Sequence, residues 1–135
     1  MGKSKPMDFA KLFSALADPT RLRLLNLMNG REVCVCYFVE ILKQPQPKIS
    51  QHLAYMRNAG IVSARREGKW MHYSISRSVD SASAEILQAA LGAIATSSQM
   101  QADIKQLNQA CCQPRRFPLD GAPLPGGVAA DCLRT

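Results

Sequence analysis

The apolar residues of this chain change their spacing at Ile61, and this change limits the folds open to it. Before Ile61 they recur at intervals of three and four, as on one face of a helix. Residues 61–76 alternate instead, and Glu67-Gly68-Lys69 supplies a turn in their middle, which predicts a β-hairpin. After residue 76 the helical interval returns. Helices interrupted by one hairpin indicate a mainly α fold of the α+β class.

Four helices are predicted before the hairpin. The first has apolar residues at i, i+3, i+4 and i+7: Phe9, Leu12, Phe13 and Leu16. Asp18 and Pro19 provide the N-cap and the first position of a second helix, which Gly30 ends. A third is expected over residues 32–43. The fourth opens at Pro47 and runs to Asn58.

The fourth helix has the side chains that reading a DNA groove requires. Ile49, Leu53 and Met56 form its apolar stripe, and hydrogen-bonding side chains occupy the rest of its surface. The hairpin that follows has a basic tip. This order predicts a winged helix-turn-helix, with the helix in the major groove and the wing along the backbone. The DNA-binding candidates are Lys48, Ser50, Gln51, His52, Tyr55, Arg57, Arg65, Arg66 and Lys69.

Net charge supports a polyanionic partner for this region. The chain carries +7, of which residues 1–30 contribute +3, residues 31–80 contribute +4 and residues 81–135 contribute zero. No apolar run is long enough to span a membrane, and no apolar core follows the N-terminal lysines. We therefore expect a cytoplasmic protein with reduced thiols and no membrane partner. A solvated basic surface without a partner is the alternative.

A second group of apolar residues follows the hairpin at helical spacing, in one helix or two: Ile86, Leu87, Ala90, Leu91, Ile94, Met100, Ile104 and Leu107. These residues either form a dimer contact or cover the chain's own core. We divide the chain into an N-terminal arm (1–7), a DNA-binding and dimerisation domain (8–97), a helical extension with a cysteine pair (98–112) and a disordered tail (113–135).

Four stretches together resemble the ArsR/SmtB family of winged-helix metalloregulatory repressors, and its arsenic-responsive branch in particular. They are Leu16-Ala-Asp-Pro-Thr-Arg-Leu-Arg-Leu-Leu25, Glu32-Val-Cys-Val-Cys36, Gln46-Pro-Lys-Ile-Ser-Gln-His-Leu53 and Arg66-Glu-Gly-Lys-Trp-Met-His-Tyr73. The resemblance implies a homodimer, built by the first helix and the helix after the wing. It also implies a repressor that leaves its operator DNA when As(III) or Sb(III) binds, with no resident cofactor.

By position in that family, Cys34 and Cys36 match the first two arsenic ligands, whereas the third falls at Val39. The family's other metal site, on the helix after the wing, needs histidine, and residues 81–105 contain none. Because As(III) favours three thiolates, Cys111 or Cys112 is the expected third donor. The alternatives are a two-cysteine site for a methylarsenical and a separate tail site that adds Cys132.

The spacing of Cys34 and Cys36 suggests a mechanism. Side chains at i and i+2 of a helix point about 200° apart, so one ion bridges them only if the first turn is distorted. A distorted third helix would displace the reading helix.

Other functions of the same thiols remain open: a redox or persulfide response, or a response to Cd(II) or Pb(II). An enzyme, such as a thiol oxidoreductase or arsenate reductase, is disfavoured. The chain has no phosphate loop, no Cys-x-x-Cys motif and no catalytic triad pattern.

Overall fold

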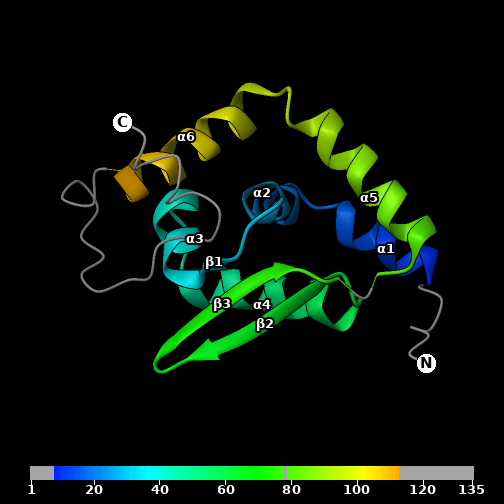
Figure 1. The fold of residues 1–135 in the computed structure, drawn as a ribbon, viewed down its shortest axis with the longest axis horizontal. Coiled ribbons are helices and arrows are strands. Elements are labelled where there is room, and N and C mark those ends of the chain that lie inside the picture. The colour runs from blue at the N-terminus through cyan, green and yellow to red at the C-terminus, as the bar shows by residue number, and fades with distance from the viewer. Residues whose placement is uncertain (1–7, 78, 113–135) are drawn as a thin grey trace.

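Six helices and three strands make up the part of the chain that the computed structural model describes, residues 8–77 and 79–112 (Figure 1). In chain order they are α1 (Phe9–Leu16), α2 (Pro19–Met28), β1 (Val33–Cys34), α3 (Val35–Leu42), α4 (Gln46–Asn58), β2 (Val62–Glu67), β3 (Trp70–Ile75), α5 (Ser81–Ile94) and α6 (Ser98–Cys112). The predicted winged helix-turn-helix is confirmed. The arm 1–7 and the tail 113–135 lie outside the described residues.

The helix boundaries follow local chemistry. The carboxylate of Asp8 accepts from the backbone N–H of Ala10 at the start of α1. At α2 the carboxylate of Asp18 accepts from Thr20 and Arg21, as the Asp-Pro pair predicts. Lys43 ends α3 in the left-handed region, with φ of 57°.

The sheet has a third strand that the sequence pattern does not reveal. β3 lies in the middle, pairing antiparallel with β2 on one side and with β1 on the other, where Val33 faces Tyr73 and Cys34 faces His72. The prediction of one helix over residues 32–43 is therefore wrong at its start. Two residues are too few for alternation to show, and here pairing with the wing decides their conformation.

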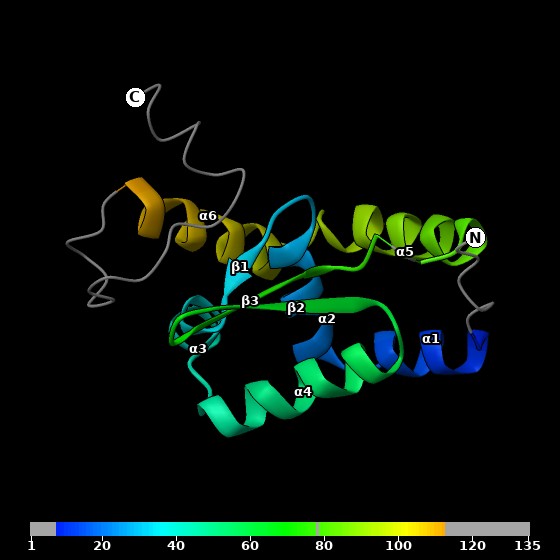
Figure 2. The same ribbon diagram turned by 60° about the horizontal axis from the view of Figure 1, so that its bottom comes forward.

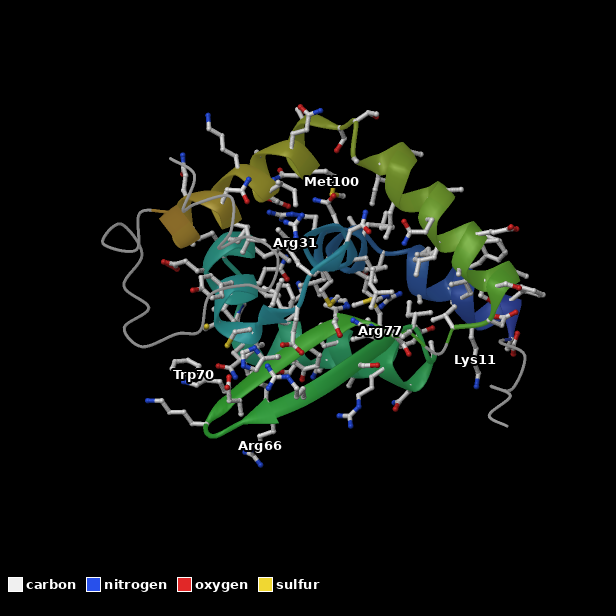
Figure 3. The ribbon with its side chains drawn as sticks, in the orientation of Figure 1. Lys11, Arg31, Arg66, Trp70, Arg77 and Met100 are labelled. Carbon is white, nitrogen blue, oxygen red and sulfur yellow. The ribbon has the colours of Figure 1, made fainter. Side chains whose placement is uncertain are left out.

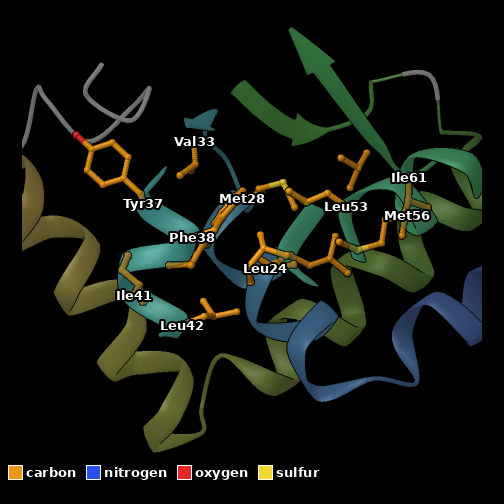
Figure 4. Packing of buried hydrophobic residues seen from close by; sticks show 14 of the residues in the cluster. Leu24, Met28, Val33, Tyr37, Phe38, Ile41, Leu42, Leu53, Met56 and Ile61 are labelled. Atoms are coloured by element: carbon orange, nitrogen blue, oxygen red, sulfur yellow. The ribbon is translucent and has the colours of Figure 1, made fainter. Parts of the chain in front are cut away.

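The core lies between the helices and one face of the sheet. Figure 4 shows Leu24 of α2 and Phe38 of α3 near its centre, with Leu53 and Met56 of α4 to one side. All four are fully buried. Burial of each such side chain contributes roughly 1.5–3 kcal/mol, so the reading helix is held by its apolar stripe.

The chain after the wing forms two helices rather than one. α5 and α6 arch over the body in Figure 1, and α6 packs against α2 and α3. Leu87, Leu91, Leu107 and Ala110 are buried within this single chain, so these residues cover its own core. On α1, Phe9 and Phe13 remain 47% and 54% exposed.

An ion pair fixes α6 to α2. The Arg23 guanidinium donates twice to Asp103, at 2.7 and 2.9 Å, and the Asp103 side chain is fully buried. This contact raises the pKa of Arg23. The Asn26 amide also donates to the Met100 carbonyl at 3.1 Å. None of the described helices is both long and apolar enough to cross a membrane.

Candidate nucleic-acid interface and thiol pair

The two cysteine sulfurs already lie together in the structure. Cys34 ends β1 and is the N-cap of α3, with extended backbone angles of φ −71° and ψ 144°. Cys36 stands in the first turn of α3, and its thiol lies 3.1 Å from the Cys34 sulfur. The premise that both cysteines are helical is therefore wrong. A helix start need not unwind to bring these thiols together.

One sulfur of the pair ionises far more readily than the other. The Cys36 thiol donates a hydrogen bond to Cys34 and, against the opposing effect of burial, lowers the pKa of Cys34 to about 6. Backbone N–H groups of Cys36 and Val35 and the nearby His72 act in the same direction. The same shared proton, together with burial, raises the pKa of Cys36. Around neutral pH the pair holds one thiolate and one thiol.

The surroundings of the pair come from α3 and the wing. Burial raises the pKa of the neighbouring Tyr37 to about 12, so its hydroxyl stays neutral. His72 is buried on β3 opposite Cys34, and its Nε2 lies 2.9 Å from Glu67 Oε1. Within the described residues no three His, Cys, Asp or Glu side chains gather as a metal site. The side chains of Cys111 and Cys112 are not among those described.

Helix α4, the predicted recognition helix, carries predicted DNA-binding residues on its exposed side and its flanks. Ile49, Leu53 and Met56 are fully buried, whereas the side opposite them is open to solvent. Ser50 and His52 are half-buried at its flanks. The exposed residues of α4 include Lys48, Gln51, Tyr55, Arg57 and Asn58.

Arg21, a residue of α2, contacts both α1 and the recognition helix α4. Its guanidinium donates to the carbonyls of Ser14 and Ala15 at 2.9 Å each, and lies 4.3 Å from the centre of the Tyr55 ring. His52 Nδ1 lies 3.4 Å from the same guanidinium. The His52 side chain, on the flank of α4, therefore faces α2. The sequence analysis does not predict this role of Arg21. The position of Arg21 in the Asp-Pro-Thr-Arg stretch could have indicated it.

The wing's basic residues are not equivalent. Arg65 forms a double hydrogen bond with Glu32, at 2.7 and 3.0 Å, which ties β2 to the residue before β1. That contact lowers the pKa of Glu32. Arg66 and Lys69 are exposed, and Lys69 lies 5.1 Å from the Trp70 ring centre. Figure 3 shows Arg66 pointing away from the body, where a phosphate can approach.

Glu32 and His72 both stand in stretches that resemble the family, but the sequence did not predict a role for either of them at the site. His72 pairs with Cys34 in the β1–β3 ladder, whereas Glu32, the residue before β1, forms an ion pair with Arg65 on β2. Without the short strand β1, no pattern connects residue 32 with residue 65.

Comparisons with known proteins identify relatives of this region. The family described as "Bacterial regulatory protein, arsR family" matches residues 18–64. An uncharacterized HTH-type transcriptional regulator of Methanocaldococcus jannaschii is 52% identical over 68 residues, covering 49% of this chain and 75% of that protein. The arsenical resistance operon repressor of Escherichia coli is 43% identical over 81 residues, covering 59% of this chain and 69% of that repressor.

A solved structure agrees with these relatives. The AntR antimony-specific transcriptional repressor aligns with a TM-score of 0.52 at 31% identity, over 64% of this chain and 76% of that one. Both the fold and the sequence of the DNA-reading region thus match transcriptional regulators. The chain belongs to the ArsR family of winged helix-turn-helix transcriptional regulators.

Proposed function

We propose that this chain represses an arsenic-resistance operon as a homodimer and leaves its operator when As(III), Sb(III) or a methylarsenical binds Cys34 and Cys36. The observation that carries the proposal is the pair of sulfurs 3.1 Å apart, one of them with a pKa lowered to about 6. A ready thiolate beside a second thiol is the donor set that a soft, thiophilic ion prefers. The Escherichia coli and AntR relatives, named for arsenical and antimony responses, support the same class of inducer.

The position of the pair supplies a route to DNA. Cys34 lies in the β1–β3 ladder, and Cys36 lies in α3, which packs against α4. An ion bound by both sulfurs replaces their shared proton and sets a new sulfur–sulfur separation. That change acts on the wing through β1 and on the recognition helix through α3. A hundredfold loss of operator affinity requires about 2.7 kcal/mol of difference between the two states.

A third thiolate from Cys111 or Cys112 completes the proposed site for inorganic As(III). Support comes from the packing of α6 against α3, since both cysteines end α6. Replacing both by serine should weaken arsenite binding at least tenfold, while a monomethylated arsenical, which takes only two thiolates, should bind as before. Equal arsenite affinity in the variant would leave the Cys34–Cys36 pair as the complete site.

Operator recognition is assigned to the exposed face of α4 and to the wing. Replacing Gln51 by alanine should weaken operator binding by roughly 1–3 kcal/mol, the usual worth of a base contact, and leave arsenite affinity unchanged. Gln101→Ala, an exposed glutamine on α6, is the matched control. A Gln51→Ala protein with normal operator affinity would place the recognition surface elsewhere.

The central test is fluorescence anisotropy of the reduced, full-length protein on its own upstream DNA. Arsenite, antimonite, a methylarsenical, Cd(II), Zn(II) and diamide are titrated in parallel. Near-stoichiometric release by the arsenicals, lost in Cys34→Ser and kept in Cys132→Ser, supports the proposal. If Cys34→Ser no longer binds DNA at all, the pair is structural instead.

A second candidate function, an oxidant response by the same thiols, is favoured by the lowered pKa of Cys34. It predicts release by diamide or polysulfide and none by arsenite. The titration above distinguishes the two inducers directly.

A further inference from the structure

The guanidinium of Arg21 has one edge on α1 and the other on α4. Its Nε and Nη2 atoms donate to the carbonyls of Ala15 and Ser14, each at 2.9 Å, near the end of α1. The other terminal nitrogen, Nη1, lies 3.4 Å from Nδ1 of His52. Two hydrogen bonds thus hold the planar group in an orientation that directs its remaining donor at the recognition helix.

This contact decides which nitrogen of a neutral His52 ring carries the proton. A guanidinium donates hydrogen bonds and accepts none, so Nδ1 must be the acceptor. Oδ1 of Asp18 lies 4.0 Å from Nδ1, beyond hydrogen-bond reach, and it already accepts from the backbone N–H groups of Thr20 and Arg21. A proton on Nδ1 would therefore oppose the Arg21 donor without reaching the carboxylate. The neutral ring is the tautomer with its proton on Nε2.

The same guanidinium also lies against Tyr55. Its carbon is 4.3 Å from the centre of the Tyr55 ring, and 43% of the surface of this residue remains exposed. Tyr55 and His52 are three positions apart, so they are neighbours on the surface of α4. Arg21 thus contacts two adjacent side chains that the sequence predicts to bind DNA.

The proton on Nε2 is turned away from α2. Nδ1 and Nε2 lie on different edges of the imidazole ring, and the Nδ1 edge faces Arg21. Figure 2 shows α4 along the lower edge of the molecule, with α2 above it. A duplex that takes α4 into its major groove has phosphates beside the flanks of the helix. The His52 side chain is 16% exposed, which suits one contact at a ring edge rather than insertion among the bases.

We propose that Arg21 is a positioning residue for operator binding, which fixes the His52 ring so that Nε2–H donates to a phosphate of the DNA backbone. The inference rests on the proposed function, in which α4 is the recognition helix. Arg21 acts through His52 and does not itself contact DNA. The bond from Nε2–H is charge-assisted, because its acceptor is an anionic oxygen. Phosphate contacts carry no sequence information, so this contact contributes to affinity and orientation rather than to base recognition.

The first test is ¹⁵N NMR of the histidine rings in the reduced, full-length protein without DNA, at a pH at which both imidazoles are neutral. The chain has two histidines, and His52→Gln assigns their signals. We expect His52 to have a protonated Nε2 and an unprotonated Nδ1. In Arg21→Lys, which keeps the charge but loses the planar group, the two signals should move toward each other as the tautomers interchange. A native ring protonated at Nδ1 would overturn the proposal.

The second test is fluorescence anisotropy on the operator and on a scrambled duplex of the same length. Arg21→Lys and His52→Asn should each weaken binding about tenfold, by the same factor on both duplexes, because a phosphate contact is lost. Glutamine places its amide N–H near the position of Nε2, whereas asparagine places it near Nδ1. His52→Gln should therefore keep most of the affinity that His52→Asn loses.

Arg23→Lys is the matched control, because Arg23 lies on the same helix as Arg21 but donates to Asp103 on α6. Unchanged binding in Arg21→Lys, or an equal loss in Arg23→Lys, overturns the proposal. So does a loss confined to the operator, because His52 would then contact a base. A native protein that binds neither duplex contradicts the proposed function as well, whereas the NMR experiment tests the tautomer separately.

Discussion

The reactivity of Cys34 follows from the side chain two residues away. Cys34 accepts from the Cys36 thiol and from backbone N–H groups at the start of α3, and these contacts outweigh the effect of burial on its pKa. An isolated cysteine at neutral pH is mostly protonated, whereas Cys34, with a pKa of about 6, is mostly thiolate. The difference can be measured without metal or DNA.

Replacing Cys36 by alanine removes the donor and should move the pKa of Cys34 upward from about 6, toward that of an ordinary thiol. Because only the thiolate reacts, alkylation of Cys34 in the native protein should slow as pH falls through 6. In Cys36→Ala it should slow at a higher pH. Iodoacetamide rates followed by peptide mass spectrometry measure both midpoints. Identical midpoints would mean that Cys36 does not donate to Cys34.

At the residue scale, the sequence predicts which residues form the candidate site better than it predicts the distances between their side chains. The identity of Cys34 and Cys36 as a pair was readable from their spacing, and so was the apolar stripe of α4. The 3.1 Å separation was not, because it depends on the extended backbone of Cys34, which pairing with His72 on β3 imposes. The side chains of Cys111 and Cys112 are not described, so their role stays a prediction.

Among the elements, the wing and β1 are connected more closely than the family pattern alone suggests. Arg65, expected to contact DNA, already has Glu32 as its partner. Either this pair holds the wing in position for DNA, or it withholds one positive charge from the phosphate backbone. Replacing Glu32 by glutamine distinguishes these two roles of the Arg65–Glu32 pair.

Glu32→Gln should strengthen operator binding severalfold at low salt, because Arg65 is released toward a phosphate. The slope of log operator affinity against log salt concentration should become steeper by about one, the value expected for one added phosphate contact. Anisotropy titrations across a salt series give both quantities. Glu85→Gln, an exposed carboxylate on α5, changes net charge equally and serves as the control. Weaker binding by Glu32→Gln alone would show that the pair's role is to position the wing.

In the molecule as a whole, α6 packs against both α2 and α3. The helical spacing of Met100, Ile104 and Leu107 predicted a helix there, although not whether it joined α5. Its attachment through Arg23 and Asp103 could not be predicted, because it joins two charges that are 80 residues apart in the sequence. The fully buried Asp103 makes this attachment sensitive to substitution.

Asp103→Ala should lower the free energy of unfolding by about 3 kcal/mol, since it leaves the Arg23 charge without its partner in a largely buried site. Urea denaturation with the linear extrapolation method measures the change. Lys105→Ala, on the exposed side of the same helix, should change stability by less than about 0.5 kcal/mol. A loss below about 1 kcal/mol in Asp103→Ala would show that water replaces the carboxylate.

The pairing of β1 with β3 has a consequence for folding kinetics. The strand that carries Cys34 comes early in the chain, and its partner strand is the second half of the wing. Contacts between segments so distant in sequence form late, after the loop between them has been ordered. The paired thiols therefore arise only when the hairpin has docked. A nascent or partly folded chain holds the same two cysteines without their acidity, and it should capture a thiophilic ion slowly until folding is complete.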